Sequence, residues 1–179
     1  MRSQSSSSPM GWTARVLAIA AFWLSGNLLL DLLVMPVMSV SGLMTQADFA
    51  TAGYSLFWSF NRLELLCAAI ILTGVLALRR QPGEFEVAHS GSRCRWALTL
   101  GLVLLSLTVI DTYVLTPEMS ALALTLSPEQ AAASLFPMPL MHGVYWLLEV
   151  VKVASLGTLG WLCWADVRDR QWATVDAAV

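Results

Sequence analysis

The sequence predicts an all-α integral membrane protein, a four-helix bundle whose helices cross the bilayer. Of the 179 residues, 57% are hydrophobic and only 12% are charged, far from the balance of a soluble domain. Four apolar stretches are each long enough to cross a hydrocarbon core of about 30 Å. Helices are expected because open strands would leave backbone groups unpaired in lipid. The predicted spans cover residues 16–38, 55–78, 96–116 and 140–164.

The basic residues predict the orientation of these spans, because cytoplasmic loops retain Lys and Arg. Eight of the ten basic residues precede the first span, separate the second from the third, or follow the fourth: Arg2, Arg15, Arg79, Arg80, Arg93, Arg95, Arg168 and Arg170. The other two loops contain no Lys or Arg. We therefore expect both termini and the middle loop to be cytoplasmic, which leaves Arg62 and Lys152 within or near the membrane.

One membrane domain is predicted between two tails. The predicted division is a disordered N-terminal tail at 1–12, the four-helix transmembrane domain at 13–167 and a C-terminal tail at 168–179. The first helix is expected to end near Pro36 and the third at Pro117, because proline interrupts helices. The run Ser127-Pro128-Glu129-Gln130 is typical of a helix start, so the third connection is predicted to hold a short interfacial helix over 128–135.

Polar residues inside the spans predict a polar pocket. Charged groups in a span cost at least about 2.5–3.5 kcal/mol each, so they face the bundle interior or water. Opposite-running helices bring these residues to similar depths in the outer half, above almost purely apolar inner halves. We therefore predict a pocket that opens outward, lined by Asn27, Asp31, Asn61, Arg62, Glu64, Asp111, Glu118, His142, Tyr145, Glu149 and Lys152.

Two interpretations of this pocket remain open. The charged groups can form structural ion pairs, with Arg62 bound to Asp31 or Asp111 and Lys152 bound to Glu149. Alternatively, because four intramembrane carboxylates face only two cations, the excess indicates a bound cation or proton.

A soft-metal site is a further hypothesis. Met138 and Met141 lie beside His142 at the start of the fourth span, and thioethers with imidazole suit Cu(I). The alternative is that these methionines fill gaps at a helix end. No other cofactor is expected, because the sequence has no Glu-x-x-His pair for a di-iron centre and a single histidine near the membrane.

The sequence offers no convincing catalytic motif, so we expect a protein that is not an enzyme. Its three cysteines, Cys67, Cys94 and Cys163, form no C-x-x-C pair. The expected partners are the lipid bilayer, anionic headgroups at the basic loop 79–95, and a membrane-protein partner or second copy, but no nucleic acid. The function favoured at this point is binding or conduction of a small cation or proton; the alternative is an accessory or assembly subunit of a larger membrane complex.

Several fragments resemble a known family. They are Phe22-Trp23-Leu24-Ser25-Gly26, Met35-Pro36, Leu56-Phe57, Tyr113-Val114-Leu115-Thr116-Pro117-Glu118 and His142-Gly143. Together they are similar to the four-span family of unknown function that includes bacterial DUF-type proteins and the human transmembrane protein linked to cisplatin resistance. The resemblance implies the same four-span fold and topology, without an established reaction. In that family the His-Gly helix carries an Asn two turns later, where this chain has Glu149.

Overall fold

The computed structural model describes residues 9–46, 48–79, 92–125 and 138–176, and all of its regular structure is helical. The α-helices are α1 (Pro9–Leu29), α2 (Met35–Val40), α3 (Phe49–Arg79), α4 (Ser92–Ile110), α5 (Thr116–Thr125) and α7 (Met138–Asp176). Two π-helical turns, η1 (Leu30–Val34) and η3 (Asp111–Leu115), continue α1 into α2 and α4 into α5, and η2 (Leu43–Thr45) is a 3-10 turn.

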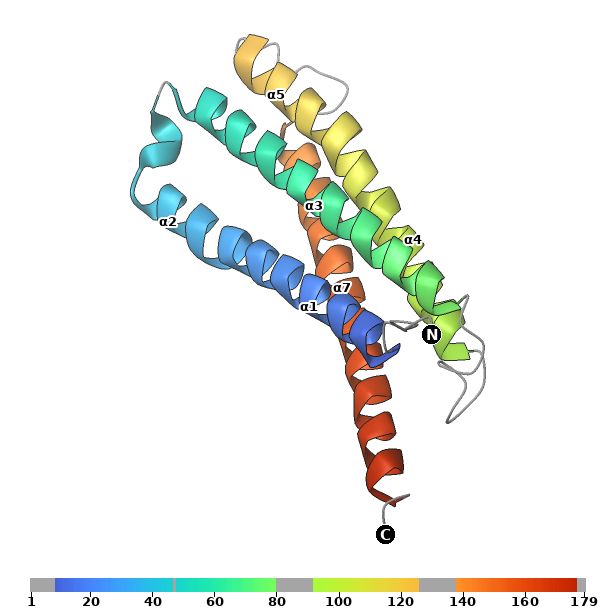
Figure 1. Cartoon of the computed structure of the whole chain (residues 1–179). Coiled ribbons are helices and arrows are strands. Elements are labelled where there is room, and N and C mark those ends of the chain that lie inside the picture. Colours follow the sequence, from blue (N-terminus) through green and yellow to red (C-terminus); the bar gives the residue numbers. More distant parts are fainter. Residues whose placement is uncertain (1–8, 47, 80–91, 126–137, 177–179) are drawn as a thin grey trace, which may run out of the picture.

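Four continuous helical segments are long and apolar enough to cross a membrane. They are Gly11–Val40, Phe49–Leu78, Arg93–Leu122 and Met138–Asp169, each of 30 to 32 residues. The prediction of an all-α chain with four potential spans is therefore confirmed for the described residues. Because the segments alternate in direction, α1 begins and α7 ends at the same end of the bundle (Figure 1). We call this the terminal end, and the opposite end, with α2 and α5, the distal end.

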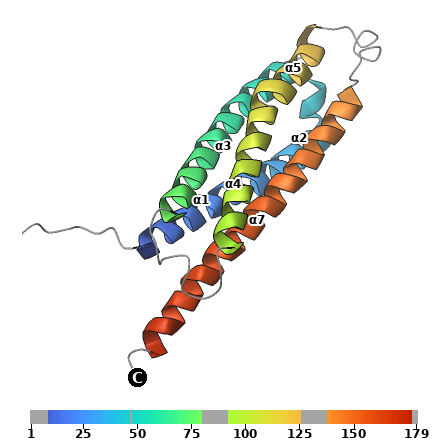
Figure 2. The ribbon, with the colours of Figure 1, turned by 90° about the vertical axis from the view of Figure 1, so that its right-hand side faces the viewer.

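The four segments pack in a ring that follows the chain order. Helix α1 packs against α3 and α7, and α4 packs against the same two helices (Figure 1). Helix α7 extends beyond the other three at the terminal end (Figure 2). Each segment thus presents one side to the middle of the bundle and another to the surroundings.

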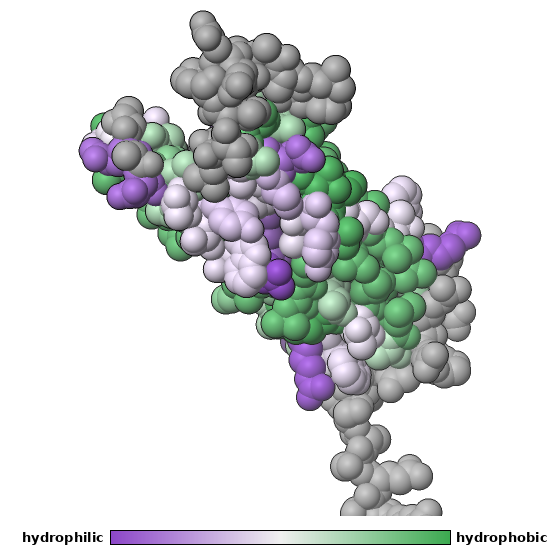
Figure 3. Space-filling view, turned by 90° about the horizontal axis from the view of Figure 1, so that it is seen from above, coloured by the Kyte–Doolittle hydropathy of each residue, from purple (hydrophilic) through white to green (hydrophobic). Residues whose placement is uncertain are grey.

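The half of the bundle nearer the terminal end has an apolar core. Val16 from α1, Ile71 from α3, Leu104 from α4 and Leu159 from α7 are buried in one cluster. Large apolar side chains also cover the outer surface, where Leu32 and Leu147 are more than half exposed. Figure 3 shows extended green areas on the face seen from above. Such a surface fits lipid contact, because nothing in water compensates so much exposed apolar area.

The helices are longer than the sequence analysis predicted. The first helix continues past Pro36 to Val40, and the third continues past Pro117 to Thr125. Each proline is the second residue after a π-helical turn, in which the N–H of Met35 or Thr116 bonds a carbonyl five residues back. The wider turn shifts the hydrogen-bond register just before the residue that lacks an N–H, so both prolines are accommodated without ending the helix.

The predicted tails are partly helical as well. Residues 9–12 belong to α1, and α7 continues to Asp176. The C-terminal part of α7 has partners that explain its order: Arg93 on α4 forms an ion pair with Asp169 at 3.0 Å. Residues 1–8 and the interfacial helix predicted at 128–135 lie outside the described residues.

Candidate functional site

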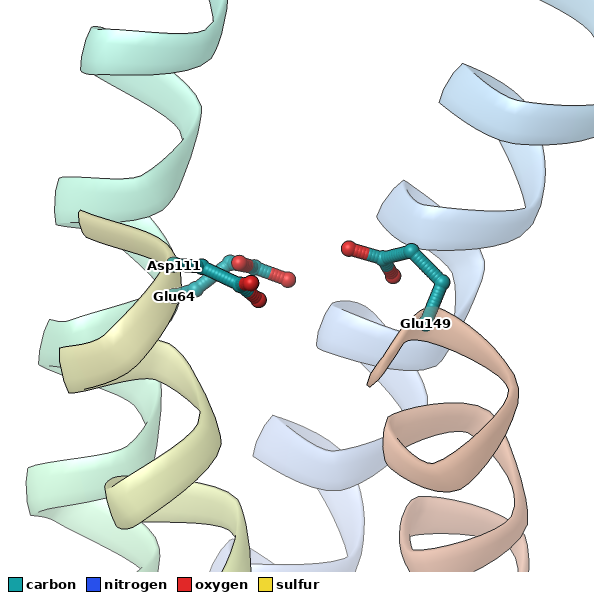
Figure 4. A group of neighbouring side chains, drawn as sticks. All are labelled: Glu64, Asp111 and Glu149. Atoms are coloured by element: carbon teal, nitrogen blue, oxygen red, sulfur yellow. The ribbon is translucent and has the colours of Figure 1, made fainter. Parts of the chain in front are cut away.

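A buried lysine lies at the centre of the bundle. The Nζ atom of Lys152, on α7, is 3.0 Å from Glu64 Oε2 on α3 and 2.9 Å from Asp111 Oδ2 on η3, and it also forms an ion pair with Glu149 Oε1 on its own helix. The four side chains are between 0% and 5% exposed. Figure 4 shows Glu64 and Asp111 side by side, with Glu149 facing them from α7. We call these four residues the carboxylate–lysine cluster.

Helix α1 completes the surroundings of this cluster through two side-chain donors. Trp23 Nε1 donates to Glu64 Oε1 at 2.8 Å, and Asn27 Nδ2 donates to Glu149 Oε2 at 3.2 Å. Both α1 residues are buried. All four potential membrane-spanning segments therefore contribute to the site, and the two donors hold the orientation of the carboxylates that they contact.

A second polar contact lies one helical turn nearer the distal end. Tyr145 OH donates to Asp31 Oδ1 at 3.1 Å. Asp31 is four residues beyond Asn27 on the first segment, and Tyr145 is four residues before Glu149 on α7, so each pair shares a helix face. Polar groups thus follow one another from Asp31 toward the cluster.

The π-helical turns place two of the carboxylates. Asp31 is the second residue of η1 and Asp111 is the first residue of η3. A π turn rotates the side chains beyond it relative to a regular α-helix, and such turns occur often at functional sites. The same distortion that accommodates the prolines therefore coincides with Asp31 and Asp111, whereas Glu64, Glu149 and Lys152 lie on regular α-helix.

The charges of the cluster do not balance. Three carboxylates surround one ammonium, and one oxygen from each carboxylate lies within 4.8 Å of the others, so the cluster has an excess of two negative charges when all four groups are ionised. In addition, Asp111 Oδ1 and Asn27 Oδ1 are buried without a hydrogen-bond partner among the described residues. Buried charge and unpaired buried polar atoms are both costly. This arrangement can lower its energy by binding protons or a cation.

Carboxylate oxygens are suitable ligands for hard metal ions. Here, however, the Nζ atom of Lys152 already occupies the space between the three carboxylates. A metal ion at the same point would require Lys152 to move, whereas a proton on a carboxylate oxygen would not. The geometry therefore fits a proton more easily than a metal ion.

The structure brings together most of the predicted pocket residues. Those that join the cluster or its adjoining contacts are Asn27, Asp31, Glu64, Asp111, Tyr145, Glu149 and Lys152. Asn61 is buried but donates to Thr116 Oγ1 at 2.7 Å. The predicted ion pair of Lys152 with Glu149 is confirmed.

Three predicted pocket residues lie elsewhere. Arg62 is exposed, and its guanidinium lies 3.9 Å from the centre of the Trp58 ring. The predicted ion pairs of Arg62 with Asp31 or Asp111 are wrong, because two residues along a helix turn the side chain by about 200°, so Arg62 points away from the side that carries Glu64. Glu118 and His142 are also exposed.

The shape and depth of the site differ from the predicted outward-opening pocket. The cluster is enclosed, and Glu64 is the sixteenth of the thirty residues in its span, close to the middle. The spans were placed too short at their distal ends, which made the polar residues look shallower than they are. The apolar region expected beneath them is present, as described above for Val16, Ile71, Leu104 and Leu159.

The three residues proposed for a soft metal do not face one point. Met141 is buried against Leu115 and Leu122, whereas His142 is exposed and its Nδ1 lies 2.9 Å from the carbonyl oxygen of Met138. Met138 packs against the same apolar cluster as Met141. The two thioethers thus serve the packing of the distal end, and the Cu(I) hypothesis gains no support from this geometry.

Trp23 and Thr116 contact predicted site residues but were not themselves predicted. A signal existed for Trp23, because it lies four residues before Asn27 and eight before Asp31, on the same face of the first helix. No comparable signal marked Thr116.

The described residues thus form a helical bundle with four potential membrane spans and an enclosed charged cluster, and comparison with known proteins adds nothing to this description. No protein-family model, curated protein or solved structure matches it. The resemblance to the four-span family described above stays a prediction.

Proposed function

We propose that this chain is a multi-pass membrane protein that binds a proton, or a small cation in its place, at the carboxylate–lysine cluster. The single observation that carries the proposal is that three buried carboxylates share one ammonium. In a low-dielectric interior such an excess of negative charge is neutralised by proton uptake or by a counter-ion. No catalytic role is proposed.

A proton is favoured over a metal ion because Lys152 Nζ occupies the position between the carboxylates. Protons can also be exchanged along hydrogen-bonding groups without displacing a side chain. The contact between Tyr145 and Asp31 supplies such groups on the distal side. A cation would instead need room, and the described residues provide that room only if Lys152 swings away.

The structure favours exchange of the bound proton with the distal side over conduction of protons through the whole bundle. On the distal side, polar groups extend from the cluster to Asp31. On the terminal side, the apolar core around Ile71 and Leu159 separates the cluster from the next buried polar contact between helices, that of Thr13 with Asp166. The basic residues near the terminal end support a topology with both termini in the cytoplasm. In this topology the proton exchanges with the non-cytoplasmic side, and the protein binds protons more readily than it conducts them.

Trp23 provides a direct probe, because its Nε1 donates to Glu64 in the cluster. The protein is labelled with fluorotryptophan, reconstituted in lipid nanodiscs, and followed by ¹⁹F NMR, with Trp23→Phe used to assign the signal. The Trp23 signal is expected to shift as pH is lowered, with a changed midpoint in Glu149→Gln. Trp164, which is exposed and pairs with Arg168, serves as the control signal.

Parallel titrations with Na⁺ and Ca²⁺ at constant pH distinguish a cation from a proton. A response to pH alone identifies proton binding, and a saturable response to one cation at constant pH identifies that cation. A Trp23 signal that responds to neither, in a folded sample, contradicts the proposal.

The second candidate is an accessory or assembly subunit in which the cluster is purely structural. It is favoured by one observation, namely that Lys152 links α3, η3 and α7 through ion pairs. An accessory subunit would copurify with a partner in mild detergent and would show an unresponsive Trp23 signal.

A further inference from the structure

The three carboxylates of the carboxylate–lysine cluster differ in the hydrogen bonds that they accept. Both oxygens of Glu64 accept hydrogen bonds from Lys152 Nζ, at 3.2 and 3.0 Å, and Oε1 also accepts one from Trp23. Glu149 forms an ion pair with Lys152 through Oε1 and accepts a hydrogen bond from Asn27 through Oε2. Each glutamate is thus contacted by the ammonium and by one neutral donor from α1, and such contacts favour the ionised form of a carboxyl group.

Asp111 has less support for its charge. Its Oδ2 atom lies 2.9 Å from Lys152 Nζ, but both of its oxygens are buried and neither accepts a hydrogen bond from a described residue. Thr108, which is buried about one helical turn earlier on α4, donates its hydroxyl to the backbone carbonyl of Leu104 instead. A buried carboxylate that accepts no hydrogen bond is costly, so Asp111 is the least favourable of the three carboxyl groups to keep ionised.

The charged groups around Asp111 also oppose its ionisation. Glu64 on α3 and Glu149 on α7 each place a carboxylate oxygen within 4.8 Å of one of its own oxygens (Figure 4). The ammonium of Lys152 on α7 offsets this repulsion, but it is shared with both glutamates. At this depth the first segment contributes two neutral donors and, one turn nearer the distal end, the carboxyl group of Asp31. Protonation of Asp111 lowers the excess of the cluster from two negative charges to one.

We infer that Asp111 is the residue that carries the bound proton, while Glu64 and Glu149 stay ionised. The inference rests on the proposed function, for which it names the residue that binds the proton. The new O–H bond forms at Oδ1, because Oδ2 is the oxygen that Lys152 contacts. Water on the distal side supplies the proton, and the net charge of the cluster rises by one. The two glutamates hold the ammonium in place beside the protonated group.

Carbon NMR of the full-length protein in lipid bilayers tests this assignment. The side-chain carboxyl carbon is labelled with ¹³C either in all aspartates or in all glutamates, and its chemical shift reports whether each group is protonated. At neutral pH we expect the aspartate-labelled sample to show a signal at the position of a protonated carboxyl group. This signal is expected to be lost in Asp111→Asn. All signals of the glutamate-labelled sample are expected at the ionised position.

Three variants serve as controls for this assignment. Asp31→Asn and Asp166→Asn also replace buried aspartates, but these residues lie outside the cluster, so both variants are expected to keep the signal. Asp111→Glu keeps a carboxyl group at the site. It is expected to move the protonated signal from the aspartate-labelled to the glutamate-labelled sample, so the assignment does not depend on Asp111→Asn being stable.

The outcomes separate this inference from the proposed function. A protonated glutamate signal that Glu64→Gln or Glu149→Gln removes, with Asp111 ionised, would overturn the inference and leave proton binding at the cluster intact. If Asp111 and every glutamate are ionised at neutral pH, the inference and proton binding at the cluster both fail.

Discussion

Replacement of Lys152 by methionine tests how strongly the cluster depends on its one cation. The substitution keeps a side chain of similar length and removes the ammonium that contacts Glu64, Asp111 and Glu149. One oxygen from each of the three carboxylates lies within 4.8 Å of the others, and two unit charges at that distance repel by about 3.5 kcal/mol at an effective dielectric constant of about 20. Breaking a buried ion pair from one side costs about 3–5 kcal/mol. We therefore expect Lys152→Met to lower the free energy of unfolding at neutral pH by about 3–5 kcal/mol.

The free energy of unfolding is measured by titrating SDS into mixed micelles of the purified protein. Two further measurements sharpen the result. The difference in free energy of unfolding between Lys152→Met and the wild type is expected to shrink as pH is lowered, because protons bound to the carboxylates replace the missing positive charge. Adding Glu149→Gln to Lys152→Met leaves two buried carboxyl groups instead of three, so less negative charge has to be neutralised, and the double variant is expected to recover part of the lost free energy of unfolding.

Arg93→Met is the control for this prediction. Arg93 also forms an ion pair at 3.0 Å, with Asp169, but both side chains are about one-third exposed. Exposed pairs contribute at most about 1 kcal/mol, so this variant should be close to wild type. If Lys152→Met is no more destabilising than Arg93→Met at neutral pH, the reasoning about the cluster is refuted.

Two further substitutions test the surroundings of the site and the packing of the helices. Trp23→Phe removes the donor to Glu64 while keeping an aromatic ring. We expect it to lower the free energy of unfolding, measured by the same SDS titration, by about 1–3 kcal/mol, because a buried carboxylate loses a hydrogen bond. An unchanged midpoint would show that this contact does not stabilise the protein. Gly74→Ala would place a Cβ atom 2.6 Å from Val16 Cγ2, so either the buried Val16 side chain changes rotamer or α1 and α3 move apart, and we expect the free energy of unfolding to fall by about 1–3 kcal/mol. Gly157→Ala is its control, because nothing lies within 4 Å of the added atom, and it should be neutral or slightly stabilising.

The number and rough position of the spans followed from the sequence because composition alone decides whether a helix can cross a bilayer. The ends of the helices did not follow. Pro36 and Pro117 were expected to stop their helices, and neither does, since a π-helical turn precedes each. The rule that proline ends a helix did not foresee the wider turn that accommodates each of these prolines.

The members of the site were predictable where helix periodicity applied. Asn27 with Asp31, and Tyr145 with Glu149, are four residues apart and point to the same side. Arg62 was misassigned because its charge, rather than its direction on the helix, decided the prediction. The pairing of Lys152 with carboxylates on two other helices required knowledge of the helix order and register, which the sequence did not provide.

The central claim is that the cluster takes up protons to balance its carboxylates, and infrared spectroscopy of the protein in lipid tests it most directly. Protonated and ionised carboxyl groups absorb at different frequencies, and isotope labelling with Glu149→Gln and Asp111→Asn assigns the bands. At neutral pH the account predicts a band from a protonated, buried carboxyl group that either substitution removes or shifts, whereas Glu118→Gln leaves it unchanged. A spectrum in which all the buried carboxyl groups are ionised at neutral pH, with no bound cation, would contradict the account.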